Sequence, residues 1–186
     1  ALDLPALCAA SAGHEVIFHL AGNPEARWGL ENTRLDLEQG TIATYNVLEA
    51  AHQAGVKRVI SASSGSVTAG WENDMPYSAL ANGQYDNAPD TWGKFDHTTP
   101  TRPRGIYGCT KIWGEAVAHH YADSTNMSVI CLRIGAVNAD DRPRGTRGYS
   151  VWCSQATIAK MVEACINAPA DLKYDVFYVV SNNKWS

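Results

Sequence analysis

The sequence predicts an α/β fold in which a parallel sheet carries helices on both faces. Short apolar runs at residues 15–22 and 56–62 end in small or hydroxyl-bearing residues, which is typical of strands buried on both faces. Apolar residues with helical spacing lie between these runs, from residue 35 to residue 54. Strand, helix and strand in this order indicate a crossover connection, which joins parallel strands.

The composition favours a globular protein without nucleic-acid or membrane partners. Of the 186 residues, 45% are hydrophobic and 18% are charged, which fits one domain covering residues 1–186. The net charge of -4 and the lack of a basic run argue against nucleic acid. No apolar run reaches the roughly 20 residues that a membrane-spanning helix needs.

The cysteines indicate a reducing compartment. Their number is odd and they form no Cys-x-x-Cys pair, so we expect reduced thiols. Because no secretory leader opens the sequence, we expect a cytoplasmic protein. The five cysteines are Cys8, Cys109, Cys131, Cys153 and Cys165.

Local signals define the first helices. Asp3 suits a helix cap and Pro5 suits the first turn, in a short helix that ends at Gly13. The longer helix over residues 35–54 closes at Gly55. Its apolar repeat consists of Leu37, Ile42, Tyr45, Leu48 and Ala51.

Residues 71–104 differ in character from the rest of the chain. They are rich in Pro, Asn, Asp, Gly and aromatic residues, and they show no sustained period. A long irregular segment in a compact domain is commonly a lid or a substrate loop. A solvated surface insertion is the other interpretation of this segment, and the sequence leaves both open.

The second half continues the alternation of helix and strand. A helix is predicted over 105–123, with Ile112, Ala116 and Val117 facing inward. The remaining elements are a strand at 128–134, a polar loop at 138–148, a helix at 154–167 and a strand at 174–180. Ligands of open parallel sheets bind outside the carboxyl ends of the strands. Here those ends are 20–22, 63–64 and 134–135.

Tyr107 and Lys111 are the strongest candidates for chemistry. Four residues apart on a helix, they lie on the same face. An ammonium beside a phenol favours the phenolate, so we expect a lowered pKa for Tyr107 and proton exchange with an alcohol. Ser64, at a nearby strand end, is a third candidate. A surface tyrosine with a solvated lysine, and a polar strand terminus, are the plainer alternatives.

No metal site is predicted. His119 and His120 are adjacent, so on a helix their side chains point about 100° apart. No His-Glu-x-x-His pattern accompanies them. A solvated helix surface explains this pair.

The ordered motifs resemble those of a known superfamily. The chain is similar to extended short-chain dehydrogenases/reductases of the NAD-dependent epimerase/dehydratase superfamily, and within them to uronate dehydrogenase-like enzymes. This resemblance implies a Rossmann-type, doubly wound parallel sheet. The motifs are His19-Leu20-Ala21-Gly22, Asn46 to Ala51, Val59 to Ser64, Tyr107-Gly108-x-x-Lys111 with Gly114-Glu115, Leu132 to Gly135, Arg147-x-x-x-x-Trp152, and Val179 to Asn183.

The resemblance implies roles for the matching catalytic residues. Tyr107 resembles the general base, Lys111 the lysine that holds the cofactor ribose, and Ser64 the hydroxyl that binds the reacting oxygen. For the substrate it implies Ser63 as an alternative to Ser64, and Arg147 as the group that holds a substrate carboxylate, a suitable task for a guanidinium. Arg142 and Arg144 are alternatives to Arg147. Besides Tyr107 and Lys111, the implied cofactor-binding residues are Leu20, Ala21, Gly22, Ile134 and Gly135.

The chain departs from the superfamily pattern in four places. It has no Gly-x-x-Gly-x-x-Gly phosphate loop, so we expect an N-terminally truncated fragment that lacks roughly 50 residues of a complete dinucleotide-binding half. Gly40 replaces an asparagine that many relatives carry. Gly65-Ser66 replaces Asn-His, and the insertion at 71–104 is long.

The expected function is oxidation of a hydroxyl of a sugar, sugar acid or sugar phosphate with NAD, with NADP as the alternative cofactor. A nucleotide-sugar epimerase or dehydratase is an alternative, as is a non-catalytic nucleotide-binding remnant. The resemblance also implies a homodimer formed through helices 37–54 and 105–123.

Overall fold

The centre of the fold is a four-stranded parallel sheet with the strand order β1-β2-β3-β4. The computed structural model describes residues 1–23 and 28–182. The prediction of a parallel sheet is therefore confirmed. The strands are β1 (Val16–His19), β2 (Arg58–Ser64), β3 (Ser128–Ile134) and β4 (Tyr174–Val179).

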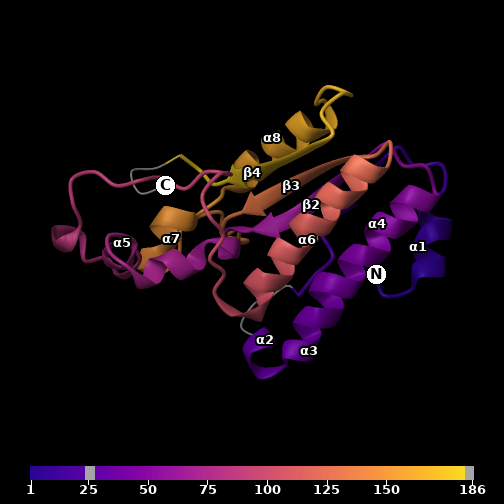
Figure 1. The fold of residues 1–186 in the computed structure, drawn as a ribbon. Helices are drawn as coiled ribbons and strands as arrows, with labels where there is room; N and C mark the ends of the chain where they lie inside the picture. Colours follow the sequence, from indigo (N-terminus) through magenta and orange to yellow (C-terminus); the bar gives the residue numbers. More distant parts are fainter. Residues whose placement is uncertain (24–27, 183–186) are drawn as a thin grey trace.

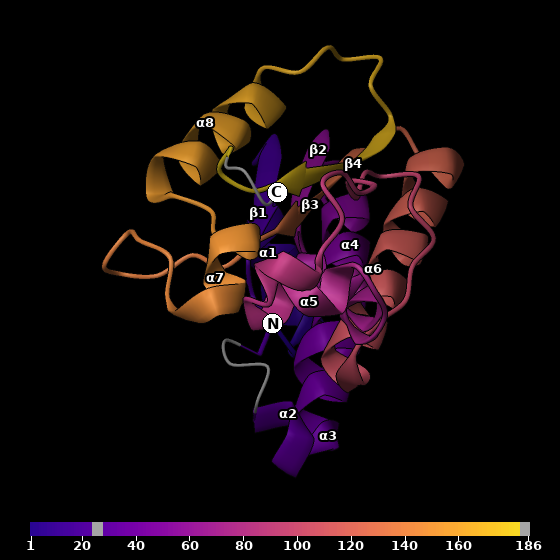
Figure 2. The ribbon, with the colours of Figure 1, turned by 90° about the vertical axis from the view of Figure 1, so that its left-hand side faces the viewer.

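Helices cover both faces of the sheet, as predicted. Helices α4 and α6 lie on one face and α8 on the other (Figures 1 and 2). The α-helices are α1 (Leu4–Ser11), α2 (Trp28–Glu31), α3 (Thr33–Asp36), α4 (Ala43–Gln53), α5 (Tyr77–Asn82), α6 (Gly105–Ser124), α7 (Gly145–Val151) and α8 (Gln155–Ile166). A π-helical turn covers Leu37–Ile42, and 3₁₀ turns cover Gly65–Val67, Ala69–Asn73 and Tyr85–Asn87.

Neighbouring residues of each central strand enter different core layers, because side chains alternate along a strand. Val59 and Val129 pack with Leu48 of α4 and with residues of α6. Ile60 and Ile130 pack instead with Cys165 and other residues of α8. The core residues of both layers are almost completely buried. The tight packing of β2 and β3 therefore fixes the position of their carboxyl ends.

Strand β1 is shorter and more exposed than predicted. It covers 16–19 rather than 15–22, and Phe18 is 41% exposed. The expected burial on both faces is therefore wrong for this strand. In the described part of the chain β1 pairs only with β2, and edge strands are less completely covered than central ones.

The predicted helix over 35–54 is divided. The π-helical turn separates α3 from α4, and Leu37, Ile42 and Tyr45 remain 49%, 42% and 44% exposed. Only Leu48 and Ala51 of the predicted stripe are buried. Since a π turn breaks the helical repeat, residues on its two sides do not form one continuous stripe.

Helix α6 also buries a different face from the predicted one. Ala116 is exposed, and Ile112 and Val117 are only partly buried. Lys111 and Glu115, four residues apart, are buried instead. Their burial follows from polar partners on β2 and β3, which an apolar pattern does not reveal.

The insertion and the neighbouring loop contain more helix than predicted. Helix α5 and two 3₁₀ turns form within residues 69–87, and α7 begins at Gly145 inside the predicted polar loop. Helices α5 and α7 lie beyond the carboxyl ends of the strands, where the arrows point in Figure 1. The motif residue Asn183 lies outside the described residues.

Candidate active site

The end of β2 presents its two serines to different surroundings. The Ser63 hydroxyl donates to Glu115 Oε1 at 2.6 Å in the buried interior. The Ser64 hydroxyl accepts from the backbone N–H of Ser66 and donates to the Ser66 hydroxyl, each at 3.1 Å, and it lies close enough to Tyr107 to lower the pKa of that phenol. The structure thus brings Ser64, but not Ser63, to Tyr107.

Helix α6 places Tyr107 and Lys111 beside this strand end. The Lys111 ammonium lies 5.5 Å from the centre of the Tyr107 ring and donates to the Ala62 carbonyl at 2.8 Å. A methyl group built on Gly108 would lie 2.8 Å from the Ser66 carbonyl oxygen. Glycine at position 108 therefore allows the first turns of α6 to approach the backbone that follows Ser64.

The pKa of Tyr107 is raised, so the predicted lowering is wrong. Burial disfavours the phenolate most strongly; the nearby Ser64 hydroxyl lowers the pKa of Tyr107, and the Asp36 charge raises it further. Burial also lowers the pKa of Lys111. Desolvation of the phenol outweighs the attraction that the spacing of the two residues suggested.

A buried ion pair joins helix α6 to strand β3. Arg133 donates from Nε and Nη2 to the two oxygens of Glu115, each at 2.9 Å. Both side chains are less than a tenth exposed, and the pair holds the pKa of Arg133 above its usual value. Glu115 belongs to one of the sequence motifs, but no role was predicted for it. Its signal was the spacing of four residues from Lys111.

The strand-end loop at 20–22 lies beside Lys111. A methyl group built on Gly22 would come within 3.6 Å of Lys111 Nζ, and Leu20 is 67% exposed. Ile134 is the register partner of Ser64 on the next strand, and Gly135 follows it directly. Gly22, Ile134 and Gly135 thus lie in the same strand-end region as Lys111 and Ser64. Residues 1–186 contain no glycine-rich loop for the phosphates of a dinucleotide.

The hydrogen bonds around His19, the residue before this loop, determine which of its ring nitrogens carries the hydrogen. The Thr44 hydroxyl donates to the Gly40 carbonyl at 2.6 Å, so the contact of 2.9 Å between Thr44 and His19 Nε2 requires Nε2 to carry the hydrogen. Burial and the nearby Lys111 charge lower the pKa of His19 to about 4. Its Nδ1 is a buried acceptor without a hydrogen-bond partner among the described residues. The sequence analysis assigned no role to Thr44.

Arg147 lies in a second region, across a cavity from the strand ends. Its Nε lies 2.8 and 2.7 Å from the two carboxylate oxygens of Glu72, and its Nη2 lies 2.7 Å from Oε1. The cavity has a volume of about 130 Å³. Gly65 and Gly135 border it on the sheet side, and aromatic residues of the insertion border it opposite.

Neither a metal site nor a membrane helix is found in residues 1–23 and 28–182. No group of three His, Cys, Asp or Glu side chains there has the geometry to hold a metal ion. His119 stacks on Tyr174 at 4.1 Å between ring centres. None of the helices described is long and apolar enough to cross a bilayer.

Comparison with known proteins identifies the family. The fold and the strand-end site define a Rossmann-like α/β protein. The model of the NAD dependent epimerase/dehydratase family matches residues 2–163, and the chain belongs to this family.

Curated relatives and solved structures agree with this assignment. NAD-dependent glucose-6-phosphate dehydrogenase of Haloferax volcanii is 29% identical over 97% of this chain and 65% of its own length. L-arabinose 1-dehydrogenase (NAD(P)(+)) of the same organism is 30% identical over 91% and 61%. The structure of uronate dehydrogenase from Agrobacterium tumefaciens in complex with NAD is 26% identical, with a TM-score of 0.76, over 99% and 61%. The chain thus spans less than two thirds of each of these proteins.

Proposed function

We propose that this chain carries the catalytic residues of an NAD-dependent dehydrogenase that oxidises a hydroxyl of a sugar, sugar acid or sugar phosphate, with NADP as a possible substitute. The observation that carries the proposal is that Lys111 Nζ lies 5.5 Å from the centre of the Tyr107 ring, beside the strand end that carries Ser64. The names of the relatives support the same reaction, since they are dehydrogenases of glucose 6-phosphate and of arabinose.

The proposed roles follow from these contacts. Ser64 binds the substrate hydroxyl, and Tyr107 takes its proton as general base. Lys111 holds the cofactor ribose and offsets the charge of the phenolate, which burial alone disfavours. NAD, when bound, would supply the hydride acceptor. Its nicotinamide half would be held by the strand-end residues Leu20, Ala21, Gly22, Ile134 and Gly135.

A dehydrogenase assay tests this proposal. The protein that carries this chain is incubated with NAD or NADP and a panel of aldoses, uronates and sugar phosphates, and NADH or NADPH formation is followed by absorbance. We expect turnover with NAD and at least one sugar. Binding of NAD without oxidation of any of them would contradict the proposal and favour a non-catalytic nucleotide-binding protein. Interconversion of nucleotide sugars without net NADH would instead favour an epimerase.

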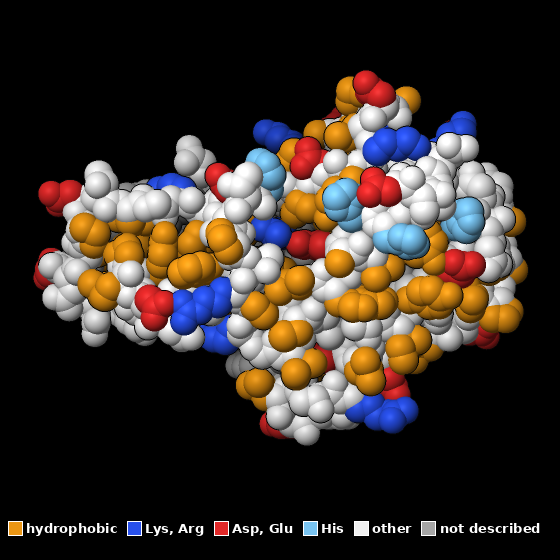
Figure 3. All heavy atoms as spheres, in the orientation of Figure 1, with side chains coloured by type: hydrophobic (Ala, Val, Ile, Leu, Met, Phe, Trp, Pro, Cys, Tyr) orange, Lys and Arg blue, Asp and Glu red, His pale blue; other side chains and the backbone are white. Residues whose placement is uncertain are grey.

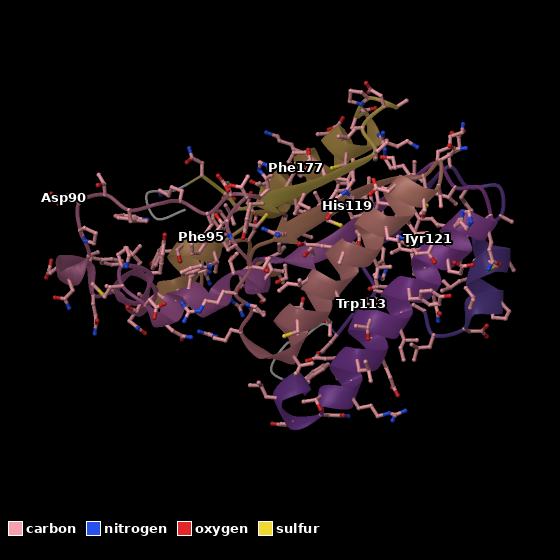
Figure 4. The ribbon with its side chains drawn as sticks, in the orientation of Figure 1. Asp90, Phe95, Trp113, His119, Tyr121 and Phe177 are labelled. Atoms are coloured by element: carbon pink, nitrogen blue, oxygen red, sulfur yellow. The ribbon has the colours of Figure 1, made fainter. Side chains whose placement is uncertain are left out.

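The proposal includes a homodimer through helices α4 and α6 and their preceding turns. Hydrophobic side chains gather on this face (Figure 3), and Trp113 of α6 lies on it (Figure 4). Four further apolar residues of these segments are 42% to 49% exposed, namely Leu37, Ile42, Tyr45 and Ile106. Apolar clusters of this kind mark association surfaces.

The free thiols of all five cysteines support the cytoplasm as the compartment.

Sedimentation equilibrium tests the dimer. We expect Trp113→Lys to shift the protein to monomer, whereas Met75→Lys, at a residue 59% exposed on the insertion, leaves the mass unchanged. An unmodified protein that sediments as a monomer at all concentrations would contradict this part of the proposal.

A further inference from the structure

The Nε and Nη2 groups of Arg147 are paired with a carboxylate of the protein itself. Its Nε and Nη2 both face the Glu72 carboxylate, at 2.7 to 2.8 Å. A guanidinium holds a ligand carboxylate through the same paired N–H groups. The Arg147–Glu72 contact therefore occupies paired N–H groups that could otherwise hold an anionic group of a substrate.

Glu72 is held firmly in this position. Its side chain is 13% exposed, and Arg104 Nη1 approaches its second oxygen at 3.4 Å. The carboxylate thus lies between two arginines, of which Arg147 lines the cavity. A second carboxylate or a phosphate would have to compete with Glu72 for the Nε and Nη2 groups of Arg147.

The rest of the cavity is suited to the uncharged face of a sugar ring. Tyr77, Trp92, Phe95 and Tyr178 supply aromatic surface, and Gly65 and Gly135 connect the cavity to the strand ends beside Ser64. Phe95 is labelled within the insertion in Figure 4. Lys94 is the other cationic residue on this wall, and its ammonium lies 5.2 Å from the Trp92 ring.

We infer that the substrate is a neutral sugar, and that Glu72 sets this preference by occupying Arg147. The inference rests on the proposed dehydrogenase function. Uronates and sugar phosphates are disfavoured because Glu72 already occupies the paired N–H groups of Arg147 that would hold their anionic group. Glu72 is in this view a specificity-determining residue that acts through Arg147.

A set of sugars that differ only at C6 tests the inference. The ratio of kcat/KM is measured for D-glucose, D-glucuronate and D-glucose 6-phosphate on the unmodified protein and on Glu72→Gln. We expect the unmodified protein to favour D-glucose over both anions. Glu72→Gln keeps the shape of the side chain and removes its charge, so we expect the preference for an anion to rise by about 10- to 100-fold, as for a buried charge–charge contact.

Two further variants identify the group that receives the anion. If Arg147 is that group, the double variant Glu72→Gln with Arg147→Met should lose the increased preference for an anionic sugar. The double variant Glu72→Gln with Lys94→Met should keep this increase. The opposite result would overturn the assignment to Arg147. An unmodified protein that prefers D-glucuronate or D-glucose 6-phosphate would overturn the inference, whether or not the variants fold.

Binding measurements separate this inference from the proposed function. Affinities for the three sugars are measured through tryptophan fluorescence, which needs no turnover. An anion preference that rises in Glu72→Gln, without oxidation of any sugar, would contradict the dehydrogenase proposal and retain the role of Glu72. Oxidation with an unchanged ratio between the sugars would contradict the role of Glu72 and retain the dehydrogenase.

Discussion

The strand-end site and the insertion side of the cavity are built in different ways. Ser64, Tyr107 and Lys111 stand on a central strand and a long helix, over the buried Arg133–Glu115 pair. Glu72 and Arg147 stand on a short 3₁₀ turn and a short helix. The first region is positioned by elements that pack in the core. The second is positioned by ion pairs between the insertion and α7. We therefore expect the first to determine whether the reaction occurs and the second to determine on which sugar.

The largest expected effect is that of Tyr107→Phe. Loss of a general base lowers kcat by about 10² to 10⁴-fold, and we expect the same factor for every sugar that the protein accepts. Changes at Glu72 should instead alter the ratio between sugars. Steady-state kinetics on two sugars checks this. Full activity of Tyr107→Phe would contradict the assigned mechanism, provided circular dichroism shows that the variant is folded.

Breaking the buried ion pair comes next. Arg133→Met leaves the Glu115 carboxylate buried without its cation, which costs about 3–5 kcal/mol of unfolding free energy. The matched control is Arg102→Met in the insertion, whose partner Asp74 is 55% exposed, and there we expect a loss below about 1 kcal/mol. Urea denaturation measures both. Equal losses in the two variants would show that the strand-end region is no more dependent on its charges than the insertion.

The buried His19 makes stability depend on pH. Its pKa is about 4 in the folded protein against 6.5 ordinarily, so the unfolded chain binds the extra proton between these values. Stability is complete above pH 6.5 and falls as the pH drops toward 4, by up to about 3 kcal/mol.

Urea midpoints at pH 7 and pH 5 measure this loss. His19→Gln should reduce the difference between the two midpoints, whereas His14→Gln, at an exposed position, should not. A pH dependence that is identical in both variants would contradict the assignment to His19.

The smallest expected effect is that of Gly40→Ala. The added methyl group would lie 2.4 Å from Thr110 Oγ1, and overpacking of this kind costs about 1–3 kcal/mol. Gly114→Ala is the control, because its methyl group would lie 3.6 Å from Thr44 Cγ2, an ordinary contact. We expect it to be neutral or to add roughly 0.5–1 kcal/mol of helix propensity. Thermal unfolding compares the two, and equal stabilities would contradict the close contact.

The two regions also differed in how well the sequence predicted them. Apolar runs identified β3 at its observed bounds and placed β2 two residues too early, and the spacing of Tyr107 and Lys111 identified their common face. The raised pKa of Tyr107 was missed because burial depends on residues far apart in the chain. The partnership of Glu72 with Arg147, 75 residues away, has no local signal at all.

Gly40 has a consequence for the history of the protein. In this geometry any side chain at position 40 is unfavourable beside Thr110, because even a methyl group would lie 2.4 Å from its hydroxyl oxygen. A change from Gly40 to a larger residue is therefore favoured only when position 110 changes first or at the same time, and the reverse change requires the opposite order. The order of substitutions, and not only their identity, is constrained at the point where α6 meets the π-helical turn.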